Sequence, residues 1–348
     1  MLPLLLLLSL PQEAEPIEGG AQDAPSISTE ALIEVGLPLE RSRADLLPPA
    51  GALGRGWMMR AGELAVTVEQ STSTFRGMRD GTQRVEAPDV LGTWSQVRRA
   101  SRSRWTVEGR YGLSENVTLS AALPLESRHV RWQGAGASGR TAHQGVGDLE
   151  LTADVRLLEQ LDERLVVGGG LVAPTGEHDA RDAWSGTPNA LLPYWLQVGG
   201  GTWQGLVSAS WIRQEEGWAW GTGARGTLPF EKNDAGWARE RTLALDAWAA
   251  RPLGRGWIGS ARLQASGWSD VRGAADEADP SRSPLEDNGR QGGDRLDASI
   301  GLAVDLSPPA TGLTNRLEFS VGTPLWEDLD GPGPAAELHF AFRWRATL

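Results

Sequence analysis

Apolar and polar residues alternate with a two-residue period over most of the chain from Gly62 onward. Such alternation is typical of β-strands that expose one apolar and one polar face. Its recurrence predicts an all-β fold of about 12 strands separated by turn-forming residues. We place these strands at residues 63–72, 104–111, 117–125, 149–157, 165–173, 191–199, 202–213, 241–251, 256–268, 294–306, 315–323 and 336–348.

The segments between the predicted strands alternate between long and short. Outer-membrane barrels have short turns at one end and longer loops at the other, whereas soluble sandwiches and propellers show no such regularity. No repeat of fixed period is present, which argues against a propeller or solenoid. Residues 62–348 are therefore predicted to form a transmembrane antiparallel up-and-down β-barrel. Its long loops are expected at 76–102, 126–146, 174–190, 214–240, 269–293 and 324–335.

The predicted strand at 294–306 favours a membrane barrel over a soluble β-sandwich, which shows the same local alternation. Its apolar face extends for about 30 Å. Tilted by roughly 40°, such a strand crosses an apolar band of about 25 Å, as an outer membrane requires. A soluble secreted β-protein remains the alternative architecture. The apolar face consists of Leu296, Ala298, Ile300, Leu302, Val304 and Leu306.

Several of the 16 Trp lie near the ends of predicted strands. Because the indole ring has an apolar body and a polar N–H, tryptophan settles at the boundary between acyl chains and headgroups. We therefore predict a membrane girdle formed by Trp105, Trp203, Trp211, Trp257, Trp268 and Trp344.

The residues before the barrel indicate export. Residues 4–10 are an apolar block of signal-peptide length, too short to span a membrane. We expect a signal peptide at 1–14 and a location in the bacterial outer membrane. The positively charged segment that normally precedes the block is missing, which indicates an unusual signal or a misassigned start. Residues 15–61 are expected to be a periplasmic linker or plug, with a short strand at 31–38.

Composition excludes several classes of protein. The mean hydropathy of -0.31 excludes a bundle of transmembrane helices, while transmembrane strands need only every second residue to be apolar. The net charge of -12 argues against binding to nucleic acid through a basic patch. The absence of cysteine fits either a reducing compartment or an exported protein, so it decides nothing alone.

The last predicted strand resembles the C-terminal signal through which outer-membrane barrels are recognised by the barrel assembly machinery. Residues 338–348 carry aromatic and apolar residues at alternate positions, ending in Leu348 where an aromatic residue is usual. The resemblance implies that this machinery is a partner of the chain.

Shorter motifs resemble two outer-membrane families. One is the transporters named after the phenol meta-cleavage pathway, and the other is domain-of-unknown-function family 3187. The resemblance covers about residues 31–180, and it implies a barrel and, less directly, the uptake of small hydrophobic compounds. The motifs lie at residues 36–38, 46–49, 110–119, 145–151 and 173–176.

The polar faces of the predicted strands carry charges of both signs, and a barrel places these faces in its lumen. Cross-strand ion pairs that brace the wall are the simpler interpretation, and a ring of charges that selects a solute is the functional one. The residues expected to line the lumen are Arg104, Glu108, Arg110, Asp148, Glu150, Asp154, Arg156, Asp246, Arg262, Asp297, Asp305, Arg316, Glu318, Glu337, His339 and Arg343.

No motif indicates catalysis, a metal or a cofactor. The 4 His are scattered, with neither HExxH nor cysteine beside them, so no zinc site is expected. No GxSxG marks the nucleophile of a hydrolase. Glycines at 134, 136 and 139 match a dinucleotide fingerprint, but no helix is expected after them. We predict that the chain is not an enzyme and has no cofactor.

The sequence therefore favours a passive outer-membrane channel or transporter for a small solute, of which hydrophobic compounds are one class. Two alternatives stay open. One is a structural or adhesive barrel that acts through its long outer loops, and the other is a lipid-modifying barrel enzyme. The expected partners are outer-membrane lipid, the assembly machinery and the solute.

Overall fold

The computed structural model describes residues 48–53, 57–85, 95–134, 137–160, 162–215, 217–306 and 314–348, which all belong to one compact unit. The expected signal peptide at 1–14 and the expected short strand at 31–38 lie outside these residues. Among the described residues, no helix is long and apolar enough to cross a membrane.

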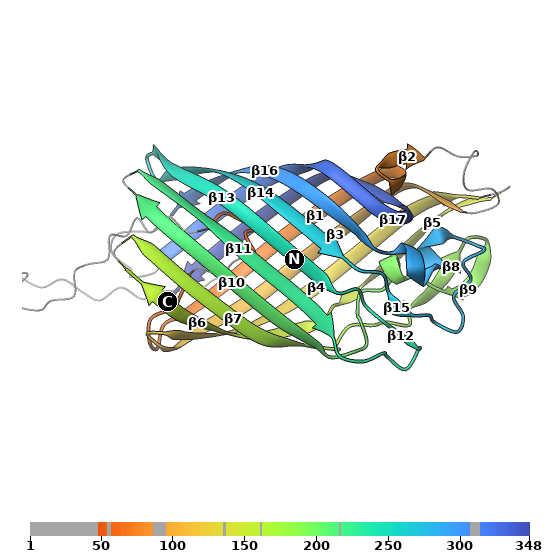
Figure 1. The fold of residues 1–348 in the computed structure, drawn as a ribbon, viewed down its shortest axis with the longest axis horizontal. Helices are drawn as coiled ribbons and strands as arrows, with labels where there is room; N and C mark the ends of the chain where they lie inside the picture. The colour runs from red at the N-terminus through yellow and green to blue at the C-terminus, as the bar shows by residue number, and fades with distance from the viewer. Residues whose placement is uncertain are drawn as a thin grey trace, which may run out of the picture. The chain divides into compact units, whose positions relative to one another are not determined.

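The described chain forms a closed antiparallel β-barrel, seen from the side in Figure 1. Neighbouring strands follow one another in chain order, and the first pairs with the last to close the ring. The predicted up-and-down barrel is confirmed. Its wall consists of β1 (Leu64–Gly81), β3 (Gln96–Ser114), β4 (Val117–Gln133), β6 (Leu149–Glu159), β7 (Glu163–Ala173), β10 (Gln204–Glu215), β11 (Trp218–Pro229), β13 (Thr242–Gly254), β14 (Trp257–Trp268), β16 (Gly293–Asp305) and β17 (Thr314–Thr347).

The last element, β17, takes two places in the wall. Its residues 316–329 pair with β16, and its residues 329–347 pair with β1 while running the opposite way. A ring whose neighbours are all antiparallel needs an even number of chain passes, so eleven strand elements close only because β17 reverses near Leu329. The predicted strands at 315–323 and 336–348 correspond to these two passes.

Burial in the wall is inverted relative to a soluble protein. Along β4, Thr118 and Glu126 face inward and are buried, whereas Leu119 and Leu125 between them are 40% and 47% exposed. Large apolar side chains are exposed on the outside all around the barrel, far more than the apolar patches of soluble monomers. They include Val107, Leu151, Leu171, Val207, Leu228, Leu245, Leu263, Ile300, Val321 and Phe340.

The two ends of the barrel differ. At one end, here called the turn end, short turns such as those at 115–116 and 255–256 join the strands. At the other, the loop end, longer connections carry short elements that gather at the right of Figure 1. The predicted alternation of short turns and long loops is confirmed, except that the expected loop at 324–335 lies within β17. The short elements are β2 (Gln83–Val85), β5 (Ser138–Val146), β8 (Arg181–Trp184), β9 (Thr187–Leu191), η1 (Tyr194–Leu196), β12 (Trp237–Ala238), β15 (Arg272–Gly273), η2 (Pro284–Glu286) and η3 (Asn288–Arg290).

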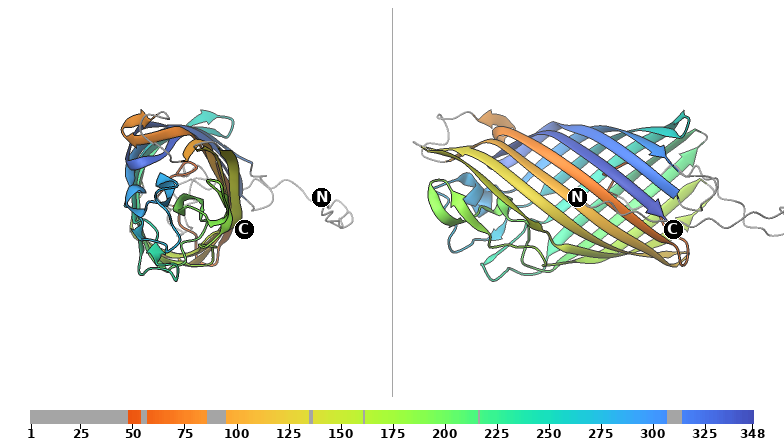
Figure 2. Two further views of the ribbon diagram at one scale, coloured as in Figure 1. Left: turned by 90° about the vertical axis from the view of Figure 1, so that its right-hand side faces the viewer. Right: turned by 180° about the vertical axis from the view of Figure 1, so that it is seen from behind.

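The loops have a hydrophobic core of their own. Trp184, Leu196 and Leu285 are at most 1% exposed and pack together with Trp132 from the loop end of β4. The rings of Trp132 and Trp184 meet edge to face, with centroids 6.0 Å apart. The left view of Figure 2, taken from the loop end, shows these loops within the outline of the barrel. They therefore narrow its mouth.

One predicted strand is wrong. The sequence pattern places a wall strand at 191–199, but this stretch contains the end of β9 and η1. β10 pairs instead with β7 on one edge and β11 on the other. Glycine and alanine occupy much of β11, so its apolar and polar positions differ little and the alternation is hard to detect. The expected loop at 214–240 is consequently reduced to 230–241.

Several strands also extend beyond their predicted ends into the expected loops. β1 reaches Gly81, β3 starts at Gln96 and β4 reaches Gln133. The sequence signal fades at these ends because arginine, serine and threonine occupy both faces. Strand pairing nevertheless continues there, since Arg102 pairs with Arg128 and Gln96 with Gln133.

Candidate functional site

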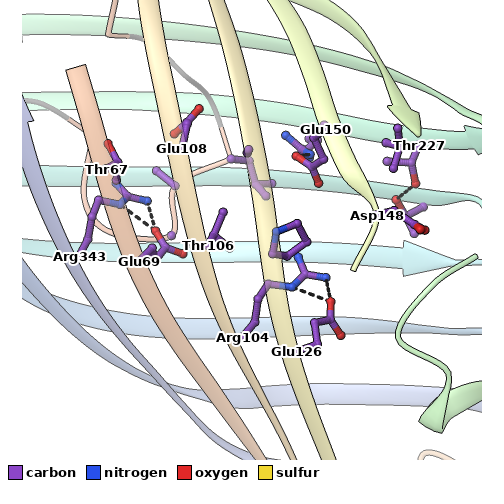
Figure 3. A pocket seen from close by; sticks show the side chains of 18 of the residues that line it. Thr67, Glu69, Arg104, Thr106, Glu108, Glu126, Asp148, Glu150, Thr227 and Arg343 are labelled. Atoms are coloured by element: carbon purple, nitrogen blue, oxygen red, sulfur yellow. Dashed lines mark hydrogen bonds and ion pairs between the residues drawn. The ribbon is translucent and has the colours of Figure 1, made fainter. Parts of the chain in front are cut away.

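The barrel interior contains a cavity of about 500 Å³ on the side of the turn end, which we call the inner cavity. Residues of the wall line it, together with Pro48, Gly51, Ala52, Leu53 and Trp57 from the segment before β1. Its lining includes eight arginines and six acidic residues. Figure 3 shows the charged side chains of several strands directed into this space. Of the predicted lumen residues, the lining contains Arg104, Glu108, Arg110, Asp148, Glu150 and Arg343.

Two predicted lumen residues hold the segment before β1 inside the barrel. The carboxylate of Asp246 accepts a hydrogen bond from the Leu53 N–H at 2.8 Å, and the Arg262 guanidinium donates to the Gly51 carbonyl. The two side chains also form an ion pair, with a nitrogen and an oxygen 3.7 Å apart. Residues 48–53 are thus attached to β13 and β14.

The same segment is held on the other side of the lumen by Trp57. Its ring lies 4.2 Å from the guanidinium carbon of Arg345 and 5.1 Å from that of Arg110. Two residues on, the Met59 N–H donates to the Thr118 hydroxyl at 3.0 Å. Arginine over an indole face is favourable, more so away from water.

Glu126 collects three arginines in the inner cavity. Strand pairing places Arg104 opposite Glu126 and Arg102 opposite Arg128, and all four side chains face inward. Glu126, 3% exposed, accepts hydrogen bonds from Arg104 at 2.8 Å, from Arg102 at 3.0 Å and from Arg128 at 2.6 Å. Like charges opposite one another repel, so this carboxylate holds the arginines together.

A second buried carboxylate has the same role nearer the turn end. Glu318, 1% exposed, lies 3.0 Å from Arg316, 3.3 Å from Arg343 and 3.9 Å from Arg345. Arg343 also lies 2.6 Å from Glu69, a contact visible in Figure 3. Glu318 thus joins the two passes of β17, and Arg343 with Glu69 joins β17 to β1.

Other predicted lumen residues form simple pairs along the wall. Arg110 and Asp154 are joined at 3.1 Å and both are buried, and Glu150 lies 2.7 Å from Arg225 across the inner cavity. The remaining pairs lie at the turn end, where Arg156 contacts Asn116 and Glu159, and Asp305 lies 3.7 Å from Arg316.

Asp148 lies at a break in the wall, where its carboxylate binds backbone N–H groups. β5 and β6 run end to end along one edge of β4, and residues 147–148 separate them. The Asp148 carboxylate accepts the backbone N–H of Gly176 at 2.9 Å and that of Gly200 at 2.8 Å. It therefore ties both ends of the 174–203 connection to the barrel wall.

A second cavity, of about 340 Å³, lies toward the loop end, and we call it the outer cavity. It is lined by five aromatic side chains. Two pairs of rings meet edge to face, with centroids 5.4 Å apart for Phe75 and Trp195 and 5.2 Å apart for Tyr194 and Trp237. The fifth ring belongs to Trp268.

Five residues line both cavities, and we call them the neck: Arg102, Arg128, Arg239, Glu240 and Thr242. The inner and outer cavities therefore follow one another along the lumen. Two of these arginines also bind backbone carbonyls of the loop at 192–203. Arg128 donates to the Trp195 carbonyl at 2.6 Å, and Arg239 donates to the Gln197 and Gly199 carbonyls at 2.7 and 2.9 Å.

A serine, a histidine and an aspartate meet beside the outer cavity. His339 lies 2.9 Å from the Ser73 hydroxyl through Nδ1 and 3.1 Å from the Asp297 carboxylate through Nε2. Acyl transfer also needs N–H donors for the oxyanion. Ser73 lies in mid-strand with hydrogen-bonded partners on both edges, so its own N–H belongs to the sheet. We interpret the contact as bracing of the wall.

Two predicted positions are wrong. Trp268 was expected in the membrane girdle, but it lines the outer cavity and its indole N–H donates to the Gln291 carbonyl at 2.8 Å. Trp257 and Trp268 are an odd number of positions apart on one strand, so they face opposite sides. Glu337 was expected in the lumen, but it lies at a β-bulge and 3.8 Å from Arg76, whose side chain is 62% exposed. The bulge reverses the alternation there.

The other predicted girdle residues lie on the outside. Trp105, Trp203, Trp257 and Trp344 are 36–48% exposed. Trp211 is less exposed because its ring packs edge to face on that of Trp220, with centroids 4.8 Å apart. Their place at a headgroup boundary stays a prediction.

The sequence reasoning missed the neck. Arg102 and Glu126 fall in the expected loops at 76–102 and 126–146, and Arg239 falls in the expected loop at 214–240. A signal was present, since Glu126 and Arg128 continue the inward positions of the predicted strand at 117–125. This signal is weak because the outward residues beyond Leu125 are no longer consistently apolar, so the alternation that marks a strand is lost.

The described residues contain no group of three or more His, Asp or Glu side chains placed to hold a metal ion. At the loop end, Glu286 is 2% exposed and accepts hydrogen bonds from the Trp184 indole at 2.8 Å and from Arg282 at 2.6 Å. Burial raises the pKa of Glu286 above its usual range, and these bonds only partly oppose it.

We expect the loop cluster around Glu286 to be more stable at mildly acidic than at neutral pH. A carboxyl whose pKa is raised by folding favours the folded state below its unfolded pKa, and this contribution is lost as pH rises through the folded pKa. Hydrogen exchange at residues 279–286, corrected for intrinsic rates, measures it. Glu286→Gln should abolish the pH dependence, and exposed Glu277→Gln should leave it intact. Equal protection at both pH values in the unsubstituted protein would contradict the expectation.

Neither a protein-family model nor a curated protein matches this sequence. Among solved structures, the fold is similar to an outer membrane channel from Pseudomonas putida F1, with a TM-score of 0.60, 16% identity, and coverage of 87% of this chain and 100% of that chain. A Pseudomonas aeruginosa FadL homologue is more distant, with a TM-score of 0.39, 10% identity, and coverage of 82% of this chain and 90% of that chain.

The CymD monoaromatic hydrocarbon channel is also distant, with a TM-score of 0.37, 10% identity, and coverage of 83% of this chain and 88% of that chain. At 16% identity the Pseudomonas putida structure bears on the fold alone. It agrees with the predicted β-barrel fold, whereas the resemblance to the two families named from motifs stays a prediction.

Proposed function

We propose that the protein is an outer-membrane channel that passes a small solute through the barrel lumen. The observation that carries this is the inversion of the barrel, with apolar side chains outside and buried charge inside. Such an exterior is stable only against lipid, and a closed barrel leaves no unpaired strand edge within the membrane. Outer-membrane lipid and the assembly machinery that recognises the last strand are the corresponding partners.

The two cavities support a path for the solute. They adjoin at the neck, and together they extend from the aromatic loop end to the charged inner half of the lumen. Charged side chains lining such a path select among solutes. The long loops leave an adhesive barrel as the alternative, but adhesion gives no reason for cavities inside the wall.

We further propose that residues 48–53 and 57–59 restrict the path as a plug. Asp246 and Arg262 hold this segment on one side of the lumen and the Trp57 ring lies between arginines on the other. Replacing Asp246 and Arg262 together avoids leaving one of them as an unpaired buried charge. Asp246→Asn with Arg262→Gln should therefore loosen the plug while the barrel stays folded.

Planar-bilayer recording of the refolded protein tests both proposals. We expect ion conductance from the unsubstituted barrel and a higher conductance from the Asp246→Asn, Arg262→Gln double variant. Asp305→Asn, a charge change at the turn end, is the control and should conduct like the unsubstituted protein. A barrel that inserts and stays closed in both forms contradicts the channel. Equal conductance of the two forms contradicts the plug.

A further inference from the structure

The neck has more positive charge than its acidic residues balance. Glu126 accepts six hydrogen bonds from Arg102, Arg104 and Arg128, two from each. A carboxylate offers about four lone-pair directions, so this one has no capacity for further donors. Three guanidinium groups thus share the charge of this one carboxylate. Glu150 and Glu69 also act on Arg104, but they form ion pairs with Arg225 and Arg343.

Arg239 adds a fourth cation to the same place. Its hydrogen bonds run to the neutral carbonyls of Gln197 and Gly199, so they leave its charge unbalanced. Of the five residues that form the neck, Glu240 is the only acidic one. Four arginines therefore face two carboxylates at the junction of the cavities, in a chain whose net charge is -12.

The excess is accessible to a solute. The side chains of Arg102 and Arg104 are each 37% exposed, whereas those of Arg128 and Glu126 are 4% and 1% exposed. The buried pair fixes the position, and the two more exposed guanidinium groups keep N–H donors toward the cavity. Arginine matches the planar shape of a carboxylate and binds it through two parallel hydrogen bonds.

The outer cavity supplies a different environment directly beside this charge. Phe75, Trp195 and Trp268 line it with partly exposed rings, whereas Trp237 and Leu285 in its lining are only 1% exposed. Flat aromatic solutes pack well against such rings. The volume of about 340 Å³ lies at the lower end of the range for small-molecule sites, which is about 300–1,000 Å³.

We propose that the neck, the adjoining Arg104 of the inner cavity and the outer cavity together bind an aromatic carboxylate, with its ring among the outer-cavity aromatics and its carboxylate on Arg102 and Arg104. This rests on the proposed channel function and names its substrate class. A neutral hydrocarbon leaves the arginine excess unbalanced, and a cation is repelled by it. A short aliphatic acid has too little apolar surface to fill the aromatic half.

Calorimetric titration of the detergent-solubilised full-length protein tests the proposal with four probes of known charge and shape. Benzoate carries both required parts. Benzyl alcohol has the ring without the charge, acetate has the charge without the ring, and benzylammonium has the opposite charge. We expect the dissociation constant of benzoate to be at least about tenfold lower than that of each other probe, a difference that calorimetry resolves well.

Substitutions separate the two halves of the site. Arg102→Gln should weaken benzoate about tenfold while leaving benzyl alcohol unchanged, the loss typical of one charge-assisted hydrogen bond. Trp195→Leu should weaken benzoate and leave acetate unchanged. Arg213→Gln makes the same charge change away from both cavities, where Arg213 contacts Glu163 and Glu215 at 3.0 Å. It should leave all affinities unchanged.

The outcomes distinguish this proposal from the channel itself. If the protein conducts ions but binds benzoate no better than benzyl alcohol, or if Arg102→Gln and Arg213→Gln behave alike, the aromatic carboxylate site is wrong and the channel stands. If benzoate binds as expected but no conductance is recorded, the site stands and the channel is wrong. A circular dichroism spectrum shows that each variant is folded, and so do retained benzyl alcohol binding for Arg102→Gln and retained acetate binding for Trp195→Leu.

Discussion

Replacing Ile300 with arginine is expected to lower the free energy of unfolding by about 2–4 kcal/mol, the cost of a cation on the lipid face near the middle of a membrane. Ile300 lies in the middle of β16, beside Ala261 and Val321 on the neighbouring strands, and is 65% exposed on the outside. If Ile300 faced water instead, an exposed arginine at this position would hardly change the free energy of unfolding. The size of the effect therefore reports whether this surface contacts lipid.

Urea unfolding in lipid vesicles measures this change, with a gel that compares heated and unheated protein as a check on folding. Gln264→Arg is the matched control, because it adds the same charge at a position that lines the outer cavity. We expect the control to be far less destabilised. If the free energy of unfolding falls equally little in both variants, the apolar exterior does not face a membrane.

Replacing Glu126 with glutamine is expected to destabilise the barrel by about 3–5 kcal/mol, the usual cost of removing one partner from a buried ion pair. The shape of the side chain is kept, so the loss comes from charge. Arg102, Arg104 and Arg128 would then face one another without the carboxylate that holds them. The repulsion acts between β3 and β4, which these side chains join.

The matched control for this variant is Glu337→Gln. Glu337 makes its ion pair with Arg76 at 3.8 Å, and both side chains are more than a third exposed. Exposed pairs contribute about 0–1 kcal/mol, so little change is expected. Denaturant midpoints of the two variants, at equal slope, give the comparison. A Glu126 variant as stable as the Glu337 variant would show that the cluster does not hold the wall together.

Much of the barrel was predictable because strand alternation is a local property. The outward positions at Leu296, Ile300 and Leu302 follow from a two-residue period, whatever the strand pairs with. The same period assigned Asp246, Arg262 and Asp297 to the inner face, where the structure gives them partners. Local information fails where the period is interrupted, as at the bulge that contains Glu337.

The neck was not predictable because it depends on pairing between distant strands. Arg102 and Glu126 are brought together by the register of β3 against β4, and Arg239 comes from the connection before β13. A shift of this register by one residue would turn the inward charges of one strand outward. Neither the register nor the inward fold of the loop at 192–203 is encoded in a short stretch of sequence.

By itself, the sequence determined the barrel, its apolar exterior, its charged interior and its alternation of turns and loops, since each is fixed by neighbours a few residues apart. Only the tertiary structure decided that residues 48–53 and 57–59 lie in the lumen. It also decided that β11 rather than 191–199 completes the wall, and that four arginines meet two carboxylates beside an aromatic cavity. These features arise from hydrogen bonds, ion pairs and ring packing between residues far apart in the chain. No short stretch of sequence determines them.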